Sequence, residues 1–230
     1  MIDLTGKTAV VFGGNGNVGH NLIEKLFLHK IDSVYTTFHT NSNNILELKK
    51  IHGDKLSLHQ VDVTNNITTQ KFVENIEQVD IGINCVGITD DHSVSKLEFE
   101  SWNNVIKTNL TGTFNTSKSL FKKMKHAKNG RIINISSIVG LQGAFGQSNY
   151  AASKSGIFGL TKTLAIEGAK YNILVNCVVP GYIASRMTEN IPKHVLNNIV
   201  QKIPLKKLGE LDDISNAVLF LSSYYSKYIT

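Results

Sequence analysis

Residues 8–27 read TAVVFGGNGNVGHNLIEKLF, and this stretch decides the fold. An apolar run ends at Phe12, glycines follow, and a helical pattern with Leu22 and Leu26 begins at once. When glycines stand between a strand and a helix, they permit a tight turn, the close approach of a pyrophosphate and the close packing of helix on strand. The N-terminus of the helix then offers its N–H groups to the phosphate. The dinucleotide-binding pattern G-x-G-x-x-G is met by Gly14, Gly16 and Gly19. An ordinary βα turn is the alternative for a lone motif of this kind.

The rest of the chain alternates short apolar runs with amphipathic stretches, which predicts an α/β fold. The expected strands are Thr8–Phe12, Ser33–Phe38, Leu56–Val61, Ile81–Cys85, Arg131–Ile135 and Leu174–Val179. The expected helices are Val18–His29, Ile45–His52, Thr69–Gln78, Phe99–Lys125, Tyr150–Lys170 and Asp212–Ser223. Right-handed βαβ units give a doubly wound parallel sheet with helices on both faces. We therefore expect a Rossmann fold, with residues 1–230 forming a single nucleotide-binding domain.

Composition excludes several classes of protein. Of the 230 residues, 41% are hydrophobic and 18% are charged, which is typical of a globular protein. No apolar run approaches the roughly 20 residues that span a bilayer, and the first residues lack a signal-peptide pattern, so we expect a cytoplasmic protein and no membrane partner. The net charge of +6 comes almost entirely from scattered lysines, which argues against nucleic-acid binding. Cys85 and Cys177 lie in apolar runs, and we expect small core residues rather than a disulfide or a metal site.

Residues 148–156, SNYAASKSG, carry the strongest chemical signal. Tyr150 and Lys154 are four residues apart and share one face of a helix. A phenol has a pKa of about 10, and a nearby ammonium is expected to lower it. The same pair is also a common feature of helix surfaces, so the spacing alone does not establish a site.

Other segments end at the same edge of the predicted sheet. Ser137 follows the strand Arg131–Ile135, residues 84–87 read NCVG at the end of another strand, and residues 179–183 read VPGYI at the end of a third. Parallel sheets bind ligands at the carboxyl ends of their strands. We therefore expect several loops to converge on one crevice, although a serine at this position is also a common turn or capping residue.

As a set, these motifs resemble the short-chain dehydrogenase/reductase family over nearly all of its domain. The resemblance implies an NAD(P)(H)-dependent oxidoreductase that reduces a carbonyl to an alcohol without a metal. It implies the catalytic residues Asn109, Ser137, Tyr150 and Lys154, with Tyr150 as proton donor. It implies contacts to the cofactor from Gly13, Asn15, Gly16, Asn17, Val18, Gly19, Phe38, His39, Asp62, Val63, Asn84, Cys85, Val86, Gly87, Tyr150, Lys154, Pro180, Gly181, Ile183 and Ser185.

The end of the second strand bears on the choice of cofactor. NAD-specific sites place an acidic residue there to hold the ribose 2′-hydroxyl, whereas residues 37–41 read TFHTN and contain no acid. No arginine or lysine is there either; the polar groups are His39 and neighbouring hydroxyls and an amide. We expect NADP(H) to be preferred over NAD(H).

The chain departs from the family pattern in two places. Asn17 stands where short members usually have glycine, so that the turn carries Gly13, Gly16 and Gly19. Members usually continue beyond Thr230 with a further strand, so we expect a sheet that lacks the last C-terminal strand. A homo-oligomer, dimer or tetramer, is expected from the family.

Residues 150–180 and 204–229 look most like 3-oxoacyl-acyl-carrier-protein reductases, which reduce a β-keto thioester with NADPH. A positive surface suits an acidic carrier protein as partner. However, a carrier-facing arginine of that group falls at Tyr171, with Lys170 beside it, while Lys128 is placed to replace another basic contact. The loop Ser185–Ile203 is expected to cover the substrate. The alternatives are an enzyme for a free small ketone, sugar or steroid, and a catalytically inactive nucleotide-binding regulator.

Overall fold

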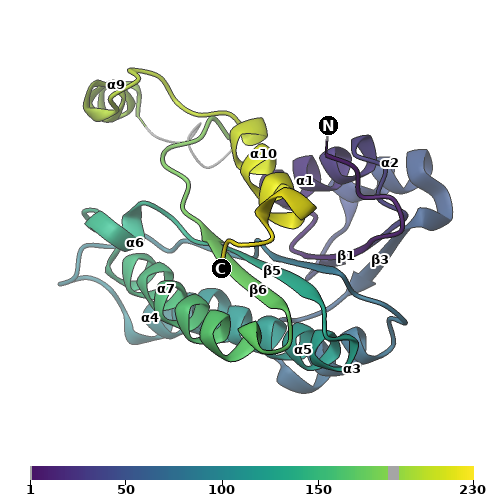
Figure 1. Ribbon diagram of the computed structural model, residues 1–230. Helices are drawn as coiled ribbons and strands as arrows, with labels where there is room; N and C mark the ends of the chain where they lie inside the picture. The colour runs from purple at the N-terminus through teal and green to yellow at the C-terminus, as the bar shows by residue number, and fades with distance from the viewer. Residues whose placement is uncertain (1, 186–191) are drawn as a thin grey trace.

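A computed structural model describes residues 2–185 and 192–230, and in it one parallel sheet organises the chain (Figure 1). The strand order is β3-β2-β1-β4-β5-β6, and all pairs are parallel. The strands are β1 (Thr8–Phe12), β2 (Ser33–Phe38), β3 (Leu56–Gln60), β4 (Ile81–Asn84), β5 (Gly130–Ile135) and β6 (Ile173–Val178). The predicted parallel sheet is thus confirmed. The order reverses between β1 and β4, which is the position where such sheets bind ligands.

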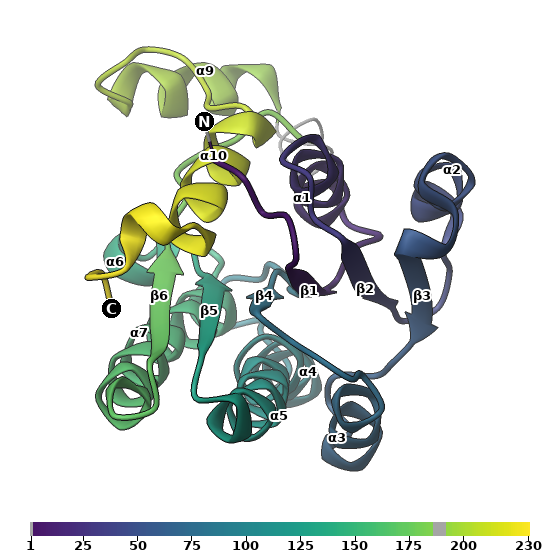
Figure 2. The ribbon, with the colours of Figure 1, turned by 45° about the vertical axis from the view of Figure 1, so that its right-hand side comes forward.

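Helices cover both faces of the sheet, as predicted. The longer ones are α1 (Asn17–Leu28), α2 (Asn43–His52), α3 (Asn66–Glu74), α4 (Phe99–Ile106), α5 (Gly112–Ala127), α7 (Ser148–Ala169), α9 (Lys193–Lys202) and α10 (Leu211–Ser222). Figure 2 shows α1, α2 and α10 on one face and α3, α4, α5 and α7 on the other. The short helical turns are Gly53–Lys55, Tyr224–Ser226 and α6 (Val139–Gln142).

Three helices differ from the prediction: α3 begins three residues before and ends four residues before the expected Thr69–Gln78, and two others differ more. The expected helix Phe99–Lys125 is interrupted by a π turn at Lys107–Thr111, which separates α4 from α5. The helix α9 lies within the segment expected to be a loop over the substrate; residues 186–191 of that segment lie outside the described residues. The apolar residues Val195, Leu196, Ile199 and Val200 recur at helical spacing, and this was the available signal for α9, although the helix fully buries none of its residues.

Successive side chains of each strand point to opposite faces of the sheet, and this divides the hydrophobic core into two parts, one on each face. In β1, Ala9 and Val11 pack with α1 and α10, whereas Val10 and Phe12 face the layer of α5. All four are fully buried. A strand covered on both faces is apolar at every position, which explains the continuous run at residues 9–12.

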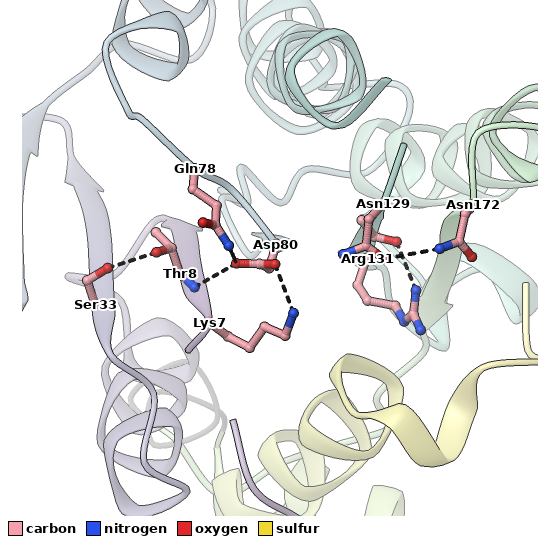
Figure 3. Close-up of polar contacts among 9 residues, drawn as sticks. Lys7, Thr8, Ser33, Gln78, Asp80, Asn129, Arg131 and Asn172 are labelled. Atoms are coloured by element: carbon pink, nitrogen blue, oxygen red, sulfur yellow. Dashed lines mark hydrogen bonds and ion pairs between the residues drawn. The ribbon is translucent and has the colours of Figure 1, made fainter. Parts of the chain in front are cut away.

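A buried carboxylate ties the strands together at their amino ends (Figure 3). Asp80 accepts hydrogen bonds from the backbone N of Thr8 (3.0 Å), from Lys7 Nζ (3.1 Å) and from Gln78 Nε2 (2.7 Å). Its backbone oxygen accepts from the N–H of Arg131 at 2.9 Å. Asp80 therefore holds β1, β4 and β5 in register, and the crevice between β1 and β4 opens at the opposite edge.

β6 forms one edge of the sheet within the described residues. Thr230 Oγ1 accepts a hydrogen bond from the Val175 N–H (3.0 Å), and the Ile229 carbonyl accepts one from Asn176 Nδ2 (2.8 Å). These last residues therefore lie along the outer side of β6. None of the described helices is both long enough and apolar enough to cross a membrane.

Candidate active site

A cleft of about 680 Å³ opens at the carboxyl ends of the strands, where the strand order reverses. It is walled by the glycine turn, by the ends of β2, β3 and β4, and by the region of the π turn. The lining residues are Gly13, Asn15, Gly16, Thr37, Phe38, His39, Thr40, Asn41, Val61, Asp62, Val63, Thr64, Cys85, Val86, Gly87, Ile88, Asn104, Lys107 and Thr108. The size and position suit an elongated ligand that reaches from β3 to β4.

The glycine turn does not accept a side chain at Gly13, Gly14 or Gly19. Gly13 has φ +89°, and a Cβ on Gly19 would lie 2.3 Å from the Gly13 carbonyl oxygen. Gly14 is buried, and a Cβ there would clash with Thr36, so Gly14 does not line the cleft. Gly13 and Gly16 line the cleft, whereas Gly14 and Gly19 are buried behind it, where the missing side chain of Gly19 lets α1 pack closely against the turn. Gly16 lines the cleft and is the N-cap of α1, and the free N–H groups at such a helix start suit a phosphate.

The side chain of Asn15 connects the glycine turn to neighbouring segments by hydrogen bonds. Asn15 Nδ2 donates to Asn41 Oδ1 at 2.8 Å, and Asn15 Oδ1 accepts from the Asn44 N–H at 3.1 Å. The glycine turn is thereby linked to the start of α2. The cleft wall beside these groups carries His39 and no carboxylate. Asp62 lies at the end of the next strand; burial opposes its ionisation, but hydrogen bonds from Thr64 and the nearby His39 and Lys107 hold its pKa below the ordinary value.

The α7 helix places Tyr150 and Lys154 on one face, as the spacing predicts. Lys154 Nζ lies 5.6 Å from the centre of the Tyr150 ring, and the side chain of Ser137, which follows β5, is near enough to the Tyr150 phenol to act on its pKa. A Cβ on Gly87 would lie 3.2 Å from Lys154 Nζ, so the lysine head lies against a cleft-lining glycine. The structure therefore brings Ser137, Tyr150 and Lys154 together at the β4–β5 end of the cleft.

Asn109 reaches the same place from the π turn. Its Oδ1 accepts from the Ile88 N–H (2.8 Å), and its Nδ2 donates to the Ile88 carbonyl (3.0 Å) and to Ser153 Oγ (3.1 Å). Its Oδ1 would be 3.6 Å from a Cβ on Gly87, next to Lys154. π turns are frequent at functional sites because they displace one side chain from the regular helix. Here the turn lets Asn109 join the loop after β4 to α7.

Three consecutive residues at the end of β5 hold α7 in place. The side chain of Asn134 donates to Thr161 Oγ1 (2.9 Å), the Ile135 carbonyl accepts from Lys154 Nζ (3.0 Å), and Ser136 Oγ donates to the Lys154 carbonyl (2.8 Å). Asn134 also accepts from Asn84 Nδ2 on β4 at 2.7 Å. Asn134 and Ser136 are buried, as is Asn84, so these contacts are screened from water. Residues 134–136, at the end of β5, thus set the position of the Tyr150 helix.

Lys154 is only 4% exposed, and burial lowers its pKa to about 8; the thiols of Cys177 and Cys85 act in the opposite direction. An ammonium with one protein hydrogen bond, to Ile135, retains donors for another partner. Near neutral pH the group is mostly a cation that loses its proton more readily than an ordinary lysine.

The expected acidification of Tyr150 is wrong for this structure. Burial raises the pKa of the phenol above its ordinary value, and the charge of Asp91 acts in the same direction, whereas the hydrogen bond with Ser137 opposes them. The ammonium of Lys154 donates to a carbonyl rather than to the phenol, which limits its effect. Tyr150 therefore keeps its proton at neutral pH, which is the state a proton donor needs.

The two cysteines are free thiols, and each is partly buried rather than fully in the core. Cys85 lines the cleft, where burial raises its pKa to about 12 and its Sγ donates to the Phe12 carbonyl at 3.0 Å. Burial likewise raises the pKa of Cys177. Both remain protonated, so neither has the character of a nucleophile.

Half of the predicted cofactor residues line the cleft: Gly13, Asn15, Gly16, Phe38, His39, Asp62, Val63, Cys85, Val86 and Gly87. Asn17, Val18 and Gly19 form the first turn of α1, and Asn84 is buried in the sheet. Tyr150 and Lys154 adjoin the cleft on α7, whereas Pro180, Gly181, Ile183 and Ser185 follow β6. The other lining residues were not predicted: Thr37, Thr40, Asn41, Val61, Thr64, Ile88, Asn104, Lys107 and Thr108. Their nearness in sequence to predicted residues was the available signal for most of them.

These observations fit a nicotinamide dinucleotide. A turn that presents Gly13 and Gly16 to the cleft allows a pyrophosphate close approach, and the wall from Phe38 to Asp62 suits an adenosine. The residues that would hold the nicotinamide end lie around Gly87 and Lys154. The cleft is therefore expected to run from an adenine end at β3 to a reacting end at Tyr150.

Comparison with known proteins agrees with this geometry. A family model described as short chain dehydrogenase matches residues 7–196. The chain is 39% identical over 230 residues to the 3-oxoacyl-[acyl-carrier-protein] reductase FabG of Rickettsia felis, covering 100% of this chain and 95% of that protein. It is 37% identical over 234 residues to the protein of the same name from Chlamydia muridarum, covering 99% of this chain and 94% of that protein.

Proposed function

The chain belongs to the short-chain dehydrogenase family and is a nicotinamide-dependent oxidoreductase, and on that premise we propose that it reduces a 3-oxoacyl thioester to the 3-hydroxyacyl thioester with NADPH. The observation that carries this proposal is the meeting of Ser137, Tyr150 and Lys154 at one end of the dinucleotide cleft. The names of the relatives support the substrate class, because they match over the whole chain.

The residues of this chain account for the proton and the charge. Tyr150 holds its proton at neutral pH and donates it to the oxygen of the substrate carbonyl. Ser137, whose side chain is near the phenol, orients that oxygen by hydrogen bonding. The Lys154 cation stabilises the phenolate left behind, and its free N–H groups are available to ribose hydroxyls. When bound, the nicotinamide supplies the hydride.

The preference for NADPH follows from the wall beside β2. A carboxylate at the end of β2 would repel a 2′-phosphate, and the cleft has none there. Instead, the side chains of His39, Thr40 and Asn41 offer hydrogen-bond donors. Asp62 is at the end of β3, one strand farther from the glycine turn.

The test is oxidation of NADPH and NADH with acetoacetyl thioesters and with free ketones. We expect turnover of the thioester, faster with NADPH. Tyr150→Phe should lower kcat by roughly 10²–10⁴-fold while NADPH still binds, and Tyr224→Phe, at an exposed tyrosine, should not change kcat. Full turnover by Tyr150→Phe would overturn the mechanism. Binding of NADPH without turnover of any carbonyl by the wild type would favour a regulatory protein instead.

We also infer a homo-oligomer. Phe99 of α4 and Ile166 of α7 lie on the same helical layer and are 75% and 79% exposed. Exposed large apolar groups on one face favour burial against another protein surface. Light scattering of the purified protein should give the mass of a dimer or a tetramer, and Ile166→Glu should weaken the association of the subunits. A monomer at micromolar concentration would refute this inference.

A further inference from the structure

The loop that follows β4 carries two adjacent carboxylates, Asp90 and Asp91, which have no role in the mechanism derived above. We propose that Asp91 determines the charge of the substrate: its carboxylate disfavours compounds with a negative charge next to the reacting carbonyl, such as free 3-oxo acids, relative to neutral 3-oxoacyl thioesters and esters. The inference rests on the proposed function, because it concerns which substrates the same site accepts.

Hydrogen bonds hold this loop against the start of α7. Gln147, the N-cap of α7, donates from Nε2 to Asp91 Oδ2 at 2.7 Å. Asn149 Nδ2 donates to the Asp90 carbonyl at 2.9 Å, and Asn149 Oδ1 accepts from the Tyr150 N–H at 2.8 Å. The two residues that bind the loop lie within three positions of Tyr150 in the sequence. The loop and the helix start therefore form one unit beside the phenol.

The negative charge of Asp91 reaches the phenol and is not neutralised nearby. Burial raises the pKa of the Tyr150 phenol, and the charge of Asp91 acts in the same direction. Among the described residues Asp91 forms no ion pair, whereas Asp90 lies 3.0 Å from His92 Nε2. The cation on the other side of the phenol is Lys154, whose ammonium donates to a backbone carbonyl of β5. Asp91 is thus an unpaired carboxylate that acts on the reacting end of the site.

Asp91 borders the site beyond the cofactor cleft. After β4, the cleft is lined by residues 85–88, and neither Asp90 nor Asp91 belongs to the lining. Lys154 adjoins the cleft through Gly87, so the nicotinamide end lies on that side of Tyr150. When the carbonyl oxygen of the substrate meets the phenol, the remainder of the substrate lies outside the cofactor cleft, on the side that Asp91 borders.

The chemistry of 3-oxo compounds makes this position selective. In a free 3-oxo acid the carboxylate is one methylene away from the reacting carbonyl, so its charge enters the site together with that carbonyl. Two negative charges brought together in a partly dehydrated site repel each other more strongly than in water. A thioester or an ester has the same skeleton without the charge and meets no repulsion. Specificity of this kind comes from an element that disfavours the wrong substrate.

The experiment compares acetoacetate with methyl acetoacetate, which differ by one methyl group and one charge. The kcat/KM for each is measured with NADPH at low and high salt for the wild type, for Asp91→Asn and for the control Glu98→Gln. The asparagine retains an oxygen that accepts from Gln147, so it removes the charge and leaves the loop bound. Glu98 is an exposed carboxylate later in the same connection, and its side chain makes no capping hydrogen bond.

We expect Asp91→Asn to lower the ratio of kcat/KM for the ester to kcat/KM for the acid by about tenfold, through faster reduction of the acid. High salt should lower this ratio in the wild type and leave it unchanged in Asp91→Asn, because salt screens the repulsion. Glu98→Gln should behave like the wild type. A purely structural role of Asp91 would instead change both substrates equally and would not respond to salt.

An unchanged ratio in Asp91→Asn, equal losses on both substrates, or the same change of ratio in Glu98→Gln would overturn the inference. If the wild type reduces methyl acetoacetate but no acetoacetyl thioester, the proposed function fails, and the ratio still decides the inference. If the wild type reduces no carbonyl compound, the proposed function also fails, and binding of acetoacetate to the NADPH complex, followed by NADPH fluorescence, decides instead. Tighter binding by Asp91→Asn than by the wild type would then support the inference, and equal binding would overturn it.

Discussion

The buried ammonium of Lys154 should leave a measurable mark on the stability of the protein. Burial lowers its pKa from the ordinary 10.5 to about 8. Below about pH 8 the folded and unfolded states both hold this proton. Between about 8 and 10.5 the unfolded chain holds a proton that the folded protein has lost, so this group makes the free energy of unfolding rise with pH. At about 1.4 kcal/mol per pH unit, the full gain is about 3 kcal/mol.

The assay isolates this contribution by comparing the wild type with Lys154→Met. Methionine has a similar volume and no charge, so every other titrating group contributes nearly equally to both proteins. Urea denaturation of the cofactor-free proteins from about pH 7 to about pH 9.5 should show the wild type gaining about 2 kcal/mol relative to the variant. Activity should be lost in the variant, because the phenolate of Tyr150 loses its neighbouring cation.

The control is Lys162→Met, which removes an exposed lysine from the same helix. Its free energy of unfolding should run parallel to that of the wild type over the whole pH range. If the Lys154→Met curve also runs parallel, the lysine head is solvated in the protein. The argument that it adjoins Gly87 inside the site would then be refuted.

Three further predictions address the cleft and its support. Gly19→Ala should abolish NADPH binding and lower the Tm, because the new Cβ has no room, whereas Gly16→Ala should keep the Tm and weaken only NADPH binding, because the nearest neighbour of its Cβ would be 3.5 Å away. Fluorescence titration measures the binding and thermal melts measure the Tm; equal Tm losses in the two variants would contradict the geometry. His39→Asp should lower the NADPH-to-NADH ratio of kcat/KM by about tenfold, since a carboxylate repels the 2′-phosphate; an unchanged ratio would place that phosphate elsewhere. Asn134→Leu should lower the free energy of unfolding, measured by urea denaturation, by about 1–3 kcal/mol, because it leaves buried polar groups without partners. It should also lower kcat, because α7 is displaced. An unchanged free energy of unfolding and an unchanged kcat would show that the contact with Thr161 is dispensable.

The local pattern of the amino-acid sequence determines by itself where several strands, turns and helices of this protein lie. Residues 8–27 specify strand, turn and helix through β-branching, glycine and a 3.6-residue period, and these are properties of neighbouring residues. The spacing of Tyr150 and Lys154 places them on one helical face by the same logic. Parallel strands with right-handed connections then bring Ser137 and Gly87 to the same edge of the sheet as the glycine turn.

Contacts between distant residues decided the rest. The pKa directions of Tyr150 and Lys154 depend on how much water the packed fold excludes, and the direction for Tyr150 was opposite to the one predicted from its lysine neighbour. The position of Asn109 depends on a π turn fixed by Ile88, which is 21 residues away in sequence. Burial and hydrogen bonding across the sheet are properties of the assembled fold, whereas periodicity and turn chemistry belong to the chain itself. The sequence therefore determined which groups take part, and the tertiary structure determined their protonation and their support.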